Sequence, residues 1–270
     1  MQLPLFLARS TPFHLVDASP WPILSSISGF LLLSSLCDFI HSSSYVGIVV
    51  GAVSTILVTR FWWRDVSREA CLGRFHNPPV QISLRIAIIW FICSEVLFFF
   101  RFFWTFFHAS LRVVAETRYA WPPARVLVLD PSSVPLLNTV LLLRSSITVT
   151  WSHNCLLIGN YSRAKNRLVF TIALRAVFTA VQYLEYCESR FSISDSAYRS
   201  VFFMATRFHR FHVLVRSAFL VVCLVRIVRR QLNASRHVGY ECAVWYWHFV
   251  DTVWIYLYCL VYWWGSRFLR

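Results

Sequence analysis

The sequence predicts an all-α polytopic membrane protein with seven transmembrane helices, and three observations predict it. Hydrophobic residues make up 57% of the 270 residues and charged residues only 14%, whereas a soluble domain usually carries about 25% charged residues. The mean hydropathy is +0.57. Several apolar stretches reach the roughly 20 residues that a helix needs to span a bilayer. Because no repeat or soluble domain interrupts this pattern, residues 1–270 are expected to form a single membrane domain.

Each predicted span is an apolar run bounded by polar, basic or proline-bearing segments. The first two are separated by "HSSSY", and the second runs into the basic "WWRDVSREACLGRFH". The third is long, and "RYAWPPARVLVLDPSSVP" divides it from the fourth. "NYSRAKNR", "YCESRFSISDS" and "RIVRRQLNASRH" separate the remaining spans. The predicted spans are residues 21–40, 45–66, 80–110, 135–157, 163–186, 197–228 and 238–264.

The loops also predict an orientation. The three arginine-rich segments fall on one side of the membrane, and "HSSSY" and the mixed-charge "YCESRFSISDS" fall on the other. The positive-inside rule then places the N-terminus in the matrix or cytoplasm. The net charge of +14 does not indicate a nucleic-acid partner, because the basic residues are interleaved with apolar runs and form no patch.

One carboxylate stands out within a span. Glu95 lies in "SEVLFFFRFFWTFFH", where aromatic and aliphatic residues are its only neighbours before Arg101. An ionisable residue at bilayer depth is costly and suggests a function, and burial disfavours its charged form. A protonated structural glutamate and a proton-handling glutamate both fit this pattern.

Histidines provide two further motifs. His209 and His212 in "FHRFH" have a spacing that allows a shared metal, but no third ligand follows at a suitable spacing. His248 and Asp251 in "WYWHFVD" lie on one helical face, which suits a hydrogen bond that fixes the histidine tautomer. A buried structural pair and a proton relay both fit. No phosphate loop, catalytic triad or compelling haem ligation is found, so no catalytic residue and no metal site is predicted.

An ordered set of motifs resembles subunit III of cytochrome c oxidase, in the haem–copper oxidase subunit III family. It extends from Pro20 to Ser266 with its spacing kept. The motifs are "SPWP", "WWRDVSRE", "PPVQ", "SEVLFFF", "WPP", "VPLLNT", "TVTWSH", "QYLEY", "FHRFHV" and "WYWHFVDTVW".

The resemblance implies a non-redox core subunit of respiratory complex IV, which transfers electrons from cytochrome c to oxygen and pumps protons. The chain would bind no cofactor itself, with haem and copper held by partner subunits. Its partners would be catalytic subunit I, the other core and accessory subunits, and membrane lipids. The resemblance also implies the mitochondrial inner membrane, with the N-terminus in the matrix and the C-terminus in the intermembrane space. A cleft filled with phospholipid would separate the first two helices from the other five.

Particular residues match functional positions of that family. Glu95 matches its carbodiimide-reactive glutamate near the middle of the membrane. The positions that match phospholipid contacts are Trp63, Arg68, Glu69, His76 and Arg226. Arginine suits this role, because its guanidinium offers a forked, permanently charged donor to phosphate.

Two other classes of membrane protein share parts of this pattern. The corresponding subunit of a quinol-using oxidase shares the seven-helix part, although "TVTWSH" and "WYWHFVDTVW" favour the cytochrome c branch. A seven-helix transporter would normally have broken helices or inverted repeats, and the sequence has neither.

The sequence departs from the family at a set of positions where the family usually has glycine. Lys165 is the only lysine among 26 basic residues, while glycine occurs 7 times. Arginine or serine stands at the departing positions, which are Arg74, Arg101, Arg118, Arg125, Arg175, Arg199, Arg207, Arg210, Arg216, Ser83, Ser146 and Ser196.

Arginines within spans are energetically unfavourable, at roughly 3 kcal/mol each near the helix centre. Because AGN codons become glycine codons when the first base changes from A to G, we hypothesise that the mature protein carries glycine at these positions. Transcript editing would explain both residue types, whereas recoding of AGR would explain only the arginines. The alternative is that the arginines are real and are neutralised by partner subunits or lipid phosphates.

Overall fold

The computed structural model describes residues 14, 17–73, 76–111, 130–188 and 197–265, and these ranges are almost entirely helical. Two π-helical segments, η1 and η3, directly follow α3 and α8. The helix limits lie within two residues of the predicted spans, except that the second helix continues through η1 to Gly73. The elements are α2 (Trp21–Ser42), α3 (Val46–Arg68), η1 (Glu69–Gly73), α4 (Pro78–Leu111), α5 (Val134–Leu157), α6 (Tyr161–Glu188), α7 (Ala197–Val228), α8 (Val238–Leu257) and η3 (Tyr258–Trp264).

Six helices in the described ranges are long and apolar enough to cross a membrane, namely α2 to α7. The helix α8 is not among them. It has 20 residues, and Glu241, His248 and Asp251 lie among its largely apolar side chains. Its predicted span is nonetheless helical over residues 238–264 once η3 is included.

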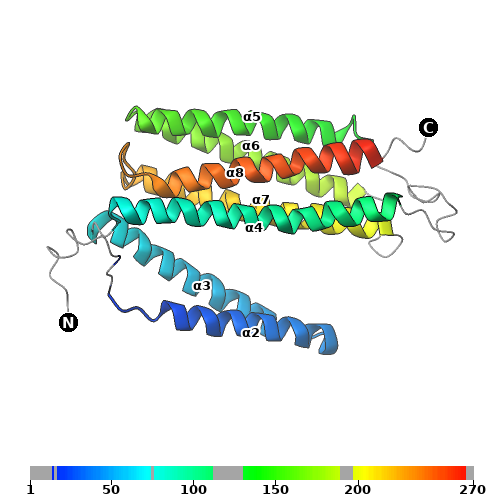
Figure 1. Cartoon of the computed structure of the whole chain (residues 1–270), viewed down its shortest axis with the longest axis horizontal. Helices are drawn as coiled ribbons and strands as arrows, with labels where there is room; N and C mark the ends of the chain where they lie inside the picture. Colours follow the sequence, from blue (N-terminus) through cyan, green and yellow to red (C-terminus); the bar gives the residue numbers. More distant parts are fainter. Residues whose placement is uncertain (1–13, 15–16, 74–75, 112–129, 189–196, 266–270) are drawn as a thin grey trace. The chain divides into compact units, whose positions relative to one another are not determined.

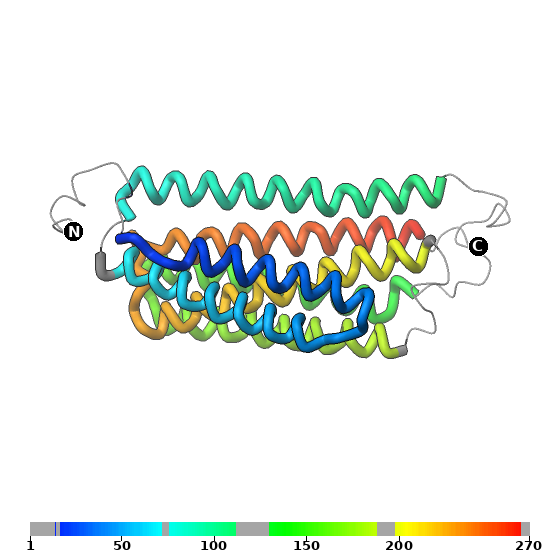
Figure 2. Tube along the Cα trace, turned by 90° about the horizontal axis from the view of Figure 1, so that it is seen from below, coloured from blue at the N-terminus to red at the C-terminus, as the bar shows by residue number. Residues whose placement is uncertain are grey.

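The chain divides into two compact units, residues 1–84 and 85–270. In the first unit α2 and α3 lie side by side (Figures 1 and 2). Ser43 ends α2 in the left-handed conformation, with φ 58°. The two helices approach closely at Gly51, where an added Cβ would lie 2.8 Å from the Cα of Leu32. A hydrogen bond from the Trp21 indole to Asp65, 2.9 Å long, also joins the two helices.

The close approach at Gly51 gives a first prediction. Gly51→Ala should separate α2 from α3 and lower stability by about 1–3 kcal/mol, because the new methyl group overlaps backbone atoms. Gly29→Ala is the matched control, since nothing lies within 4 Å of the added Cβ at that position. Hydrogen exchange of the α2 and α3 amides in the purified complex measures the effect. Equal protection in the two variants would contradict the prediction.

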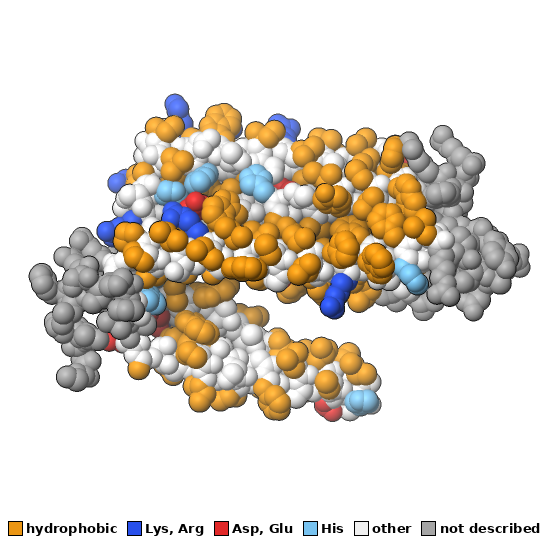
Figure 3. All heavy atoms as spheres, in the orientation of Figure 1, with side chains coloured by type: hydrophobic (Ala, Val, Ile, Leu, Met, Phe, Trp, Pro, Cys, Tyr) orange, Lys and Arg blue, Asp and Glu red, His pale blue; other side chains and the backbone are white. Residues whose placement is uncertain are grey.

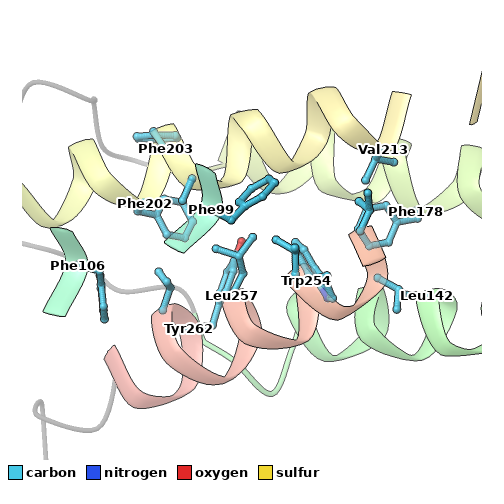
Figure 4. Packing of buried hydrophobic residues seen from close by; sticks show 14 of the residues in the cluster. Phe99, Phe106, Leu142, Phe178, Phe202, Phe203, Val213, Trp254, Leu257 and Tyr262 are labelled. Atoms are coloured by element: carbon cyan, nitrogen blue, oxygen red, sulfur yellow. The ribbon is translucent and has the colours of Figure 1, made fainter. Parts of the chain in front are cut away.

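The second unit has α8 at its centre. This helix packs against α5 and α7, and α6 packs against both of these helices. Trp247, Trp254 and Leu257 of α8 are fully buried. Figure 4 shows Trp254 and Leu257 facing buried residues of α7, with Leu142 of α5 nearby. Aromatic side chains therefore form much of this core.

The outward side chains are also apolar. Figure 3 shows hydrophobic side chains spread over the visible face. On α4, Trp90 is 71% exposed and Trp104 is 64% exposed. A face of this kind suits lipid tails or partner helices, since an apolar surface is not excluded from a membrane.

Candidate functional site

The carboxylate of Glu95 on α4 pairs with a histidine of α7. Its Oε2 lies 2.7 Å from Nε2 of His212, and the side chains are 19% and 9% exposed, respectively. Glu95 is isolated in the sequence but not in the structure. Nothing in the local sequence around Glu95 indicates this partner, because His212 is 117 residues away. The common central position of both residues in their spans is the only sequence signal.

The contact made by the other ring nitrogen of His212 determines which nitrogen of the imidazole carries a proton. Its Nδ1 lies 2.7 Å from the backbone oxygen of Phe208. Because a carbonyl oxygen only accepts hydrogen bonds, we assign a proton to Nδ1. The contact between Nε2 and Glu95 then holds one further proton, either on the carboxyl group or on the imidazole. The pair can therefore hold an exchangeable proton within the helical bundle.

Aromatic rings surround this pair. The ring centroid of Phe99 lies 5.1 Å from that of His212 in an edge arrangement, and the ring centroid of Phe98 lies 6.1 Å away. His209 does not share the site. Its Nε2 lies 3.2 Å from the backbone oxygen of Val250 on α8, and its ring packs against Trp254. The two histidines of "FHRFH" thus contact different partners.

A second buried polar cluster centres on Asp251 of α8, which is 4% exposed. Its carboxylate accepts hydrogen bonds from Arg175 of α6 and Arg216 of α7. The hydroxyl of Ser146 on α5 also donates to it, at 2.6 Å. The guanidinium carbons of the two arginines lie 4.7 and 4.4 Å from the ring centroid of Trp247. One carboxylate thus joins four helices.

The charges of this cluster do not balance. Arg175 and Arg216 are each 1% exposed and share the single carboxylate of Asp251. Two side-chain nitrogens of each arginine are buried without a hydrogen-bond partner among the described residues. A buried charge that lacks full compensation is strongly destabilising. As the sequence is written, one positive charge is left over in this cluster.

The predicted direct bond between His248 and Asp251 is not among the hydrogen bonds of the described ranges. The Ser146 hydroxyl lies between them, with its Oγ 3.2 Å from Nδ1 of His248. Nε2 of His248 lies 3.3 Å from the Thr150 hydroxyl. The expected pair is therefore indirect, and His248 is only half-buried.

The remaining arginines and serines at family glycine positions have varied surroundings. Arg101 is exposed on α4. The guanidinium of Arg207 lies over Phe203, and that of Arg210 over Tyr183. Arg199 is buried, and the Ser83 hydroxyl bonds to a backbone oxygen one turn earlier. The positions outside the described residues are Arg74, Arg118, Arg125 and Ser196.

Four of the predicted lipid contacts lie in the last two turns of α3 or shortly after it. Trp63 is 61% exposed. The side chain of Arg68 is 64% exposed and lies 4.0 Å from Asp65. Glu69 and His76 are both partly exposed and follow within a few residues. Arg226, in the last turn of α7, belongs to the second unit and is half-buried.

A further interhelical ion pair was not predicted from the sequence. The guanidinium of Arg85, near the start of α4, donates to Glu241 in the first turn of α8 at 2.9 Å. The sequence places both residues near span ends on the same predicted side of the membrane. This common depth is the signal that would have suggested the pair.

The helices and the polar pairs within them define a multi-pass helical membrane protein. The chain belongs to the family of cytochrome c oxidase subunit III, whose family model matches residues 11–266. The relatives are named cytochrome c oxidase subunit 3. The protein of Anopheles gambiae is 47% identical over 255 residues, which cover 94% of this chain and 97% of the relative. That of Danio rerio is 48% identical over 254 residues, with 94% and 97% coverage. That of Prototheca wickerhamii is 45% identical over 260 residues, with 96% and 99% coverage.

This membership confirms the resemblance noted in the sequence. The chain is a multi-pass inner-membrane subunit of cytochrome c oxidase. The alternative of a seven-helix transporter is thereby set aside.

Proposed function

We propose that this subunit supports proton uptake by the oxidase through the Glu95–His212 pair. The 2.7 Å contact between the Glu95 carboxylate and the His212 imidazole carries the proposal. Two groups that share one proton across a single hydrogen bond can act in turn as proton donor and proton acceptor. The chain itself would hold no redox centre and no catalytic residue, with haem and copper in partner subunits.

The test is Glu95→Gln in the assembled, membrane-reconstituted oxidase. Glutamine keeps the shape and a hydrogen bond to His212 but cannot release a proton. We expect slower proton uptake or earlier loss of activity during turnover, with an unchanged amount of assembled complex. Glu241→Gln is the matched control, because this residue is also a carboxylate paired across two helices. A Glu95→Gln enzyme with normal proton uptake and sustained turnover would restrict Glu95 to a structural role.

We also propose that phospholipid binds in a cleft between the first two helices and the other five. The residues in contact with it would be Trp63, Arg68, Glu69, His76 and Arg226. The guanidinium of Arg68 supports this, since it is 64% exposed and, among the described residues, its one ion-pair contact is to Asp65 at 4.0 Å. Arg68→Ala should lower the phospholipid content of the purified complex, as measured by native mass spectrometry. Arg60→Ala is the control, because Arg60 is also an exposed arginine of α3 and lies eight residues earlier. Equal lipid content in the two variants would contradict the assignment.

We further propose that the chain packs on the catalytic subunit I of the oxidase, with other core and accessory subunits around it. The apolar faces of the helices support such contacts. The orientation expected from the basic loops places the N-terminus in the matrix and the C-terminus in the intermembrane space. Protease treatment of sealed mitoplasts and of inverted vesicles tests this orientation. Cleavage of the N-terminus from the intermembrane-space side would contradict it.

A further inference from the structure

Three metal-binding side chains come together in the first unit. His14 precedes α2, Glu69 begins η1 and His76 precedes α4. One ligand atom from each of these residues lies within 4.8 Å of the others. The two imidazole centroids are 5.7 Å apart, with the rings inclined at 61°. The fold thus brings His14 next to Glu69 and His76, which lie more than 50 residues later in the chain.

The ligand chemistry matches zinc. Two histidine nitrogens and one glutamate oxygen are a known zinc ligand set, with bonds of about 2.0–2.1 Å in tetrahedral geometry. Such geometry places neighbouring ligand atoms about 3.4 Å apart. A closing movement on the order of 1 Å therefore brings the three atoms to coordination distance. This is within the range of side-chain rotation for the exposed His14 and the partly exposed Glu69 and His76.

The nearby charges leave the Glu69 carboxylate available. The carboxylate of Asp65, one turn earlier on α3, accepts hydrogen bonds from the Trp21 indole and the Arg64 guanidinium. The guanidinium of Arg68 also lies 4.0 Å from the carboxylate of Asp65. Within the described ranges, no hydrogen bond or ion pair joins Glu69 to another side chain. The arginines near this end of α3 thus compensate Asp65, and the carboxylate of Glu69 faces two imidazoles.

We propose that His14, Glu69 and His76 bind a divalent metal ion of the zinc type, with water as the fourth ligand. The ion would tie the segment before α2 to the end of α3 and to the start of α4. This site goes beyond the proposed proton and lipid roles. It is compatible with lipid binding, because the positive ion offsets the repulsion between the Glu69 carboxylate and a lipid phosphate.

The test measures zinc in the assembled oxidase. The complex is stripped with a chelator, equilibrated with limiting Zn²⁺, and analysed for bound zinc per haem. The wild type should bind one zinc ion more than His14→Ala, Glu69→Gln or His76→Ala. Loss of an outer-shell partner typically lowers metal affinity by roughly 10–100-fold. Loss of a direct ligand should lower the zinc affinity by more than this. His14→Ala is the cleanest variant, because the side chain is exposed.

His41→Ala is the matched control, since His41 is an exposed histidine in the last turn of α2. It should retain the wild-type zinc content. If His14→Ala and Glu69→Gln both retain as much zinc as the wild type at equal haem content, the proposal is overturned. Oxidase turnover, measured in the same samples, separates this result from a failure of the proton-uptake proposal.

Discussion

Replacing Trp254 by alanine is expected to destabilise the subunit by about 3–5 kcal/mol, the usual cost of removing a large buried aromatic side chain. Trp254 is fully buried. Its indole packs edge-on against Phe178, with the ring centroids 5.2 Å apart, and against His209. Its Nε1 donates to the Thr139 hydroxyl at 3.1 Å. The substitution therefore leaves a cavity between helices and removes a hydrogen bond between α8 and α5.

The loss should appear as a lower temperature of thermal inactivation of the purified complex and as less subunit per haem in membranes. Trp104→Ala is the matched control, because Trp104 is the same residue type but 64% exposed. It should change the stability of the chain much less. Similar losses in the two variants would show that the core around Trp254 is not what holds α8 in place.

The helices of this protein could be predicted from the sequence because each is a long apolar run in a medium that requires every backbone group to be hydrogen-bonded internally. The helix ends were predicted less accurately. The second span was expected to end at residue 66, but the helix continues through α3 and η1 to Gly73. Polar residues such as Asp65 obscure that end, although Asp65 takes part in a bond to Trp21 of α2.

The polar contacts within the bundle could be predicted only in part. Sequence position gives the depth of Glu95 and of His212 in the membrane, but not which side of each helix faces the other. That depends on how α4 and α7 are rotated, which is set by packing of residues such as Phe98 against Phe208. In the same way, the pattern placed His248 and Asp251 on one face, whereas the Ser146 hydroxyl between them belongs to another helix.

The arginines at family glycine positions are expected to be glycines in the mature protein. Peptide mass spectrometry across residues 205–217 of the purified protein is expected to show glycine at positions 207, 210 and 216. The structure provides physical support for this hypothesis. Arg175 and Arg216 share one carboxylate and leave buried nitrogens without partners. Each arginine near the centre of a span raises the free energy of membrane insertion by roughly 3 kcal/mol, so several of them strongly destabilise one membrane domain.

Asp251→Asn tests independently whether arginine or glycine stands at positions 175 and 216. If arginine stands at positions 175 and 216, this change leaves two buried guanidiniums without a counter-charge and should cost about 3–5 kcal/mol. With glycine at these positions, Asp251 has neither arginine partner, and the variant should accumulate nearly normally. We expect the second result.

Glycine at position 146 would also remove the hydroxyl that lies between His248 and Asp251. The direct pair expected from "WYWHFVD" would then have room to form. Peptides with arginine masses at positions 207 and 210 would instead show that the hypothesis is wrong. The excess positive charge would then have to be compensated by lipid phosphates or by carboxylates of partner subunits, and Asp251 would be indispensable for assembly.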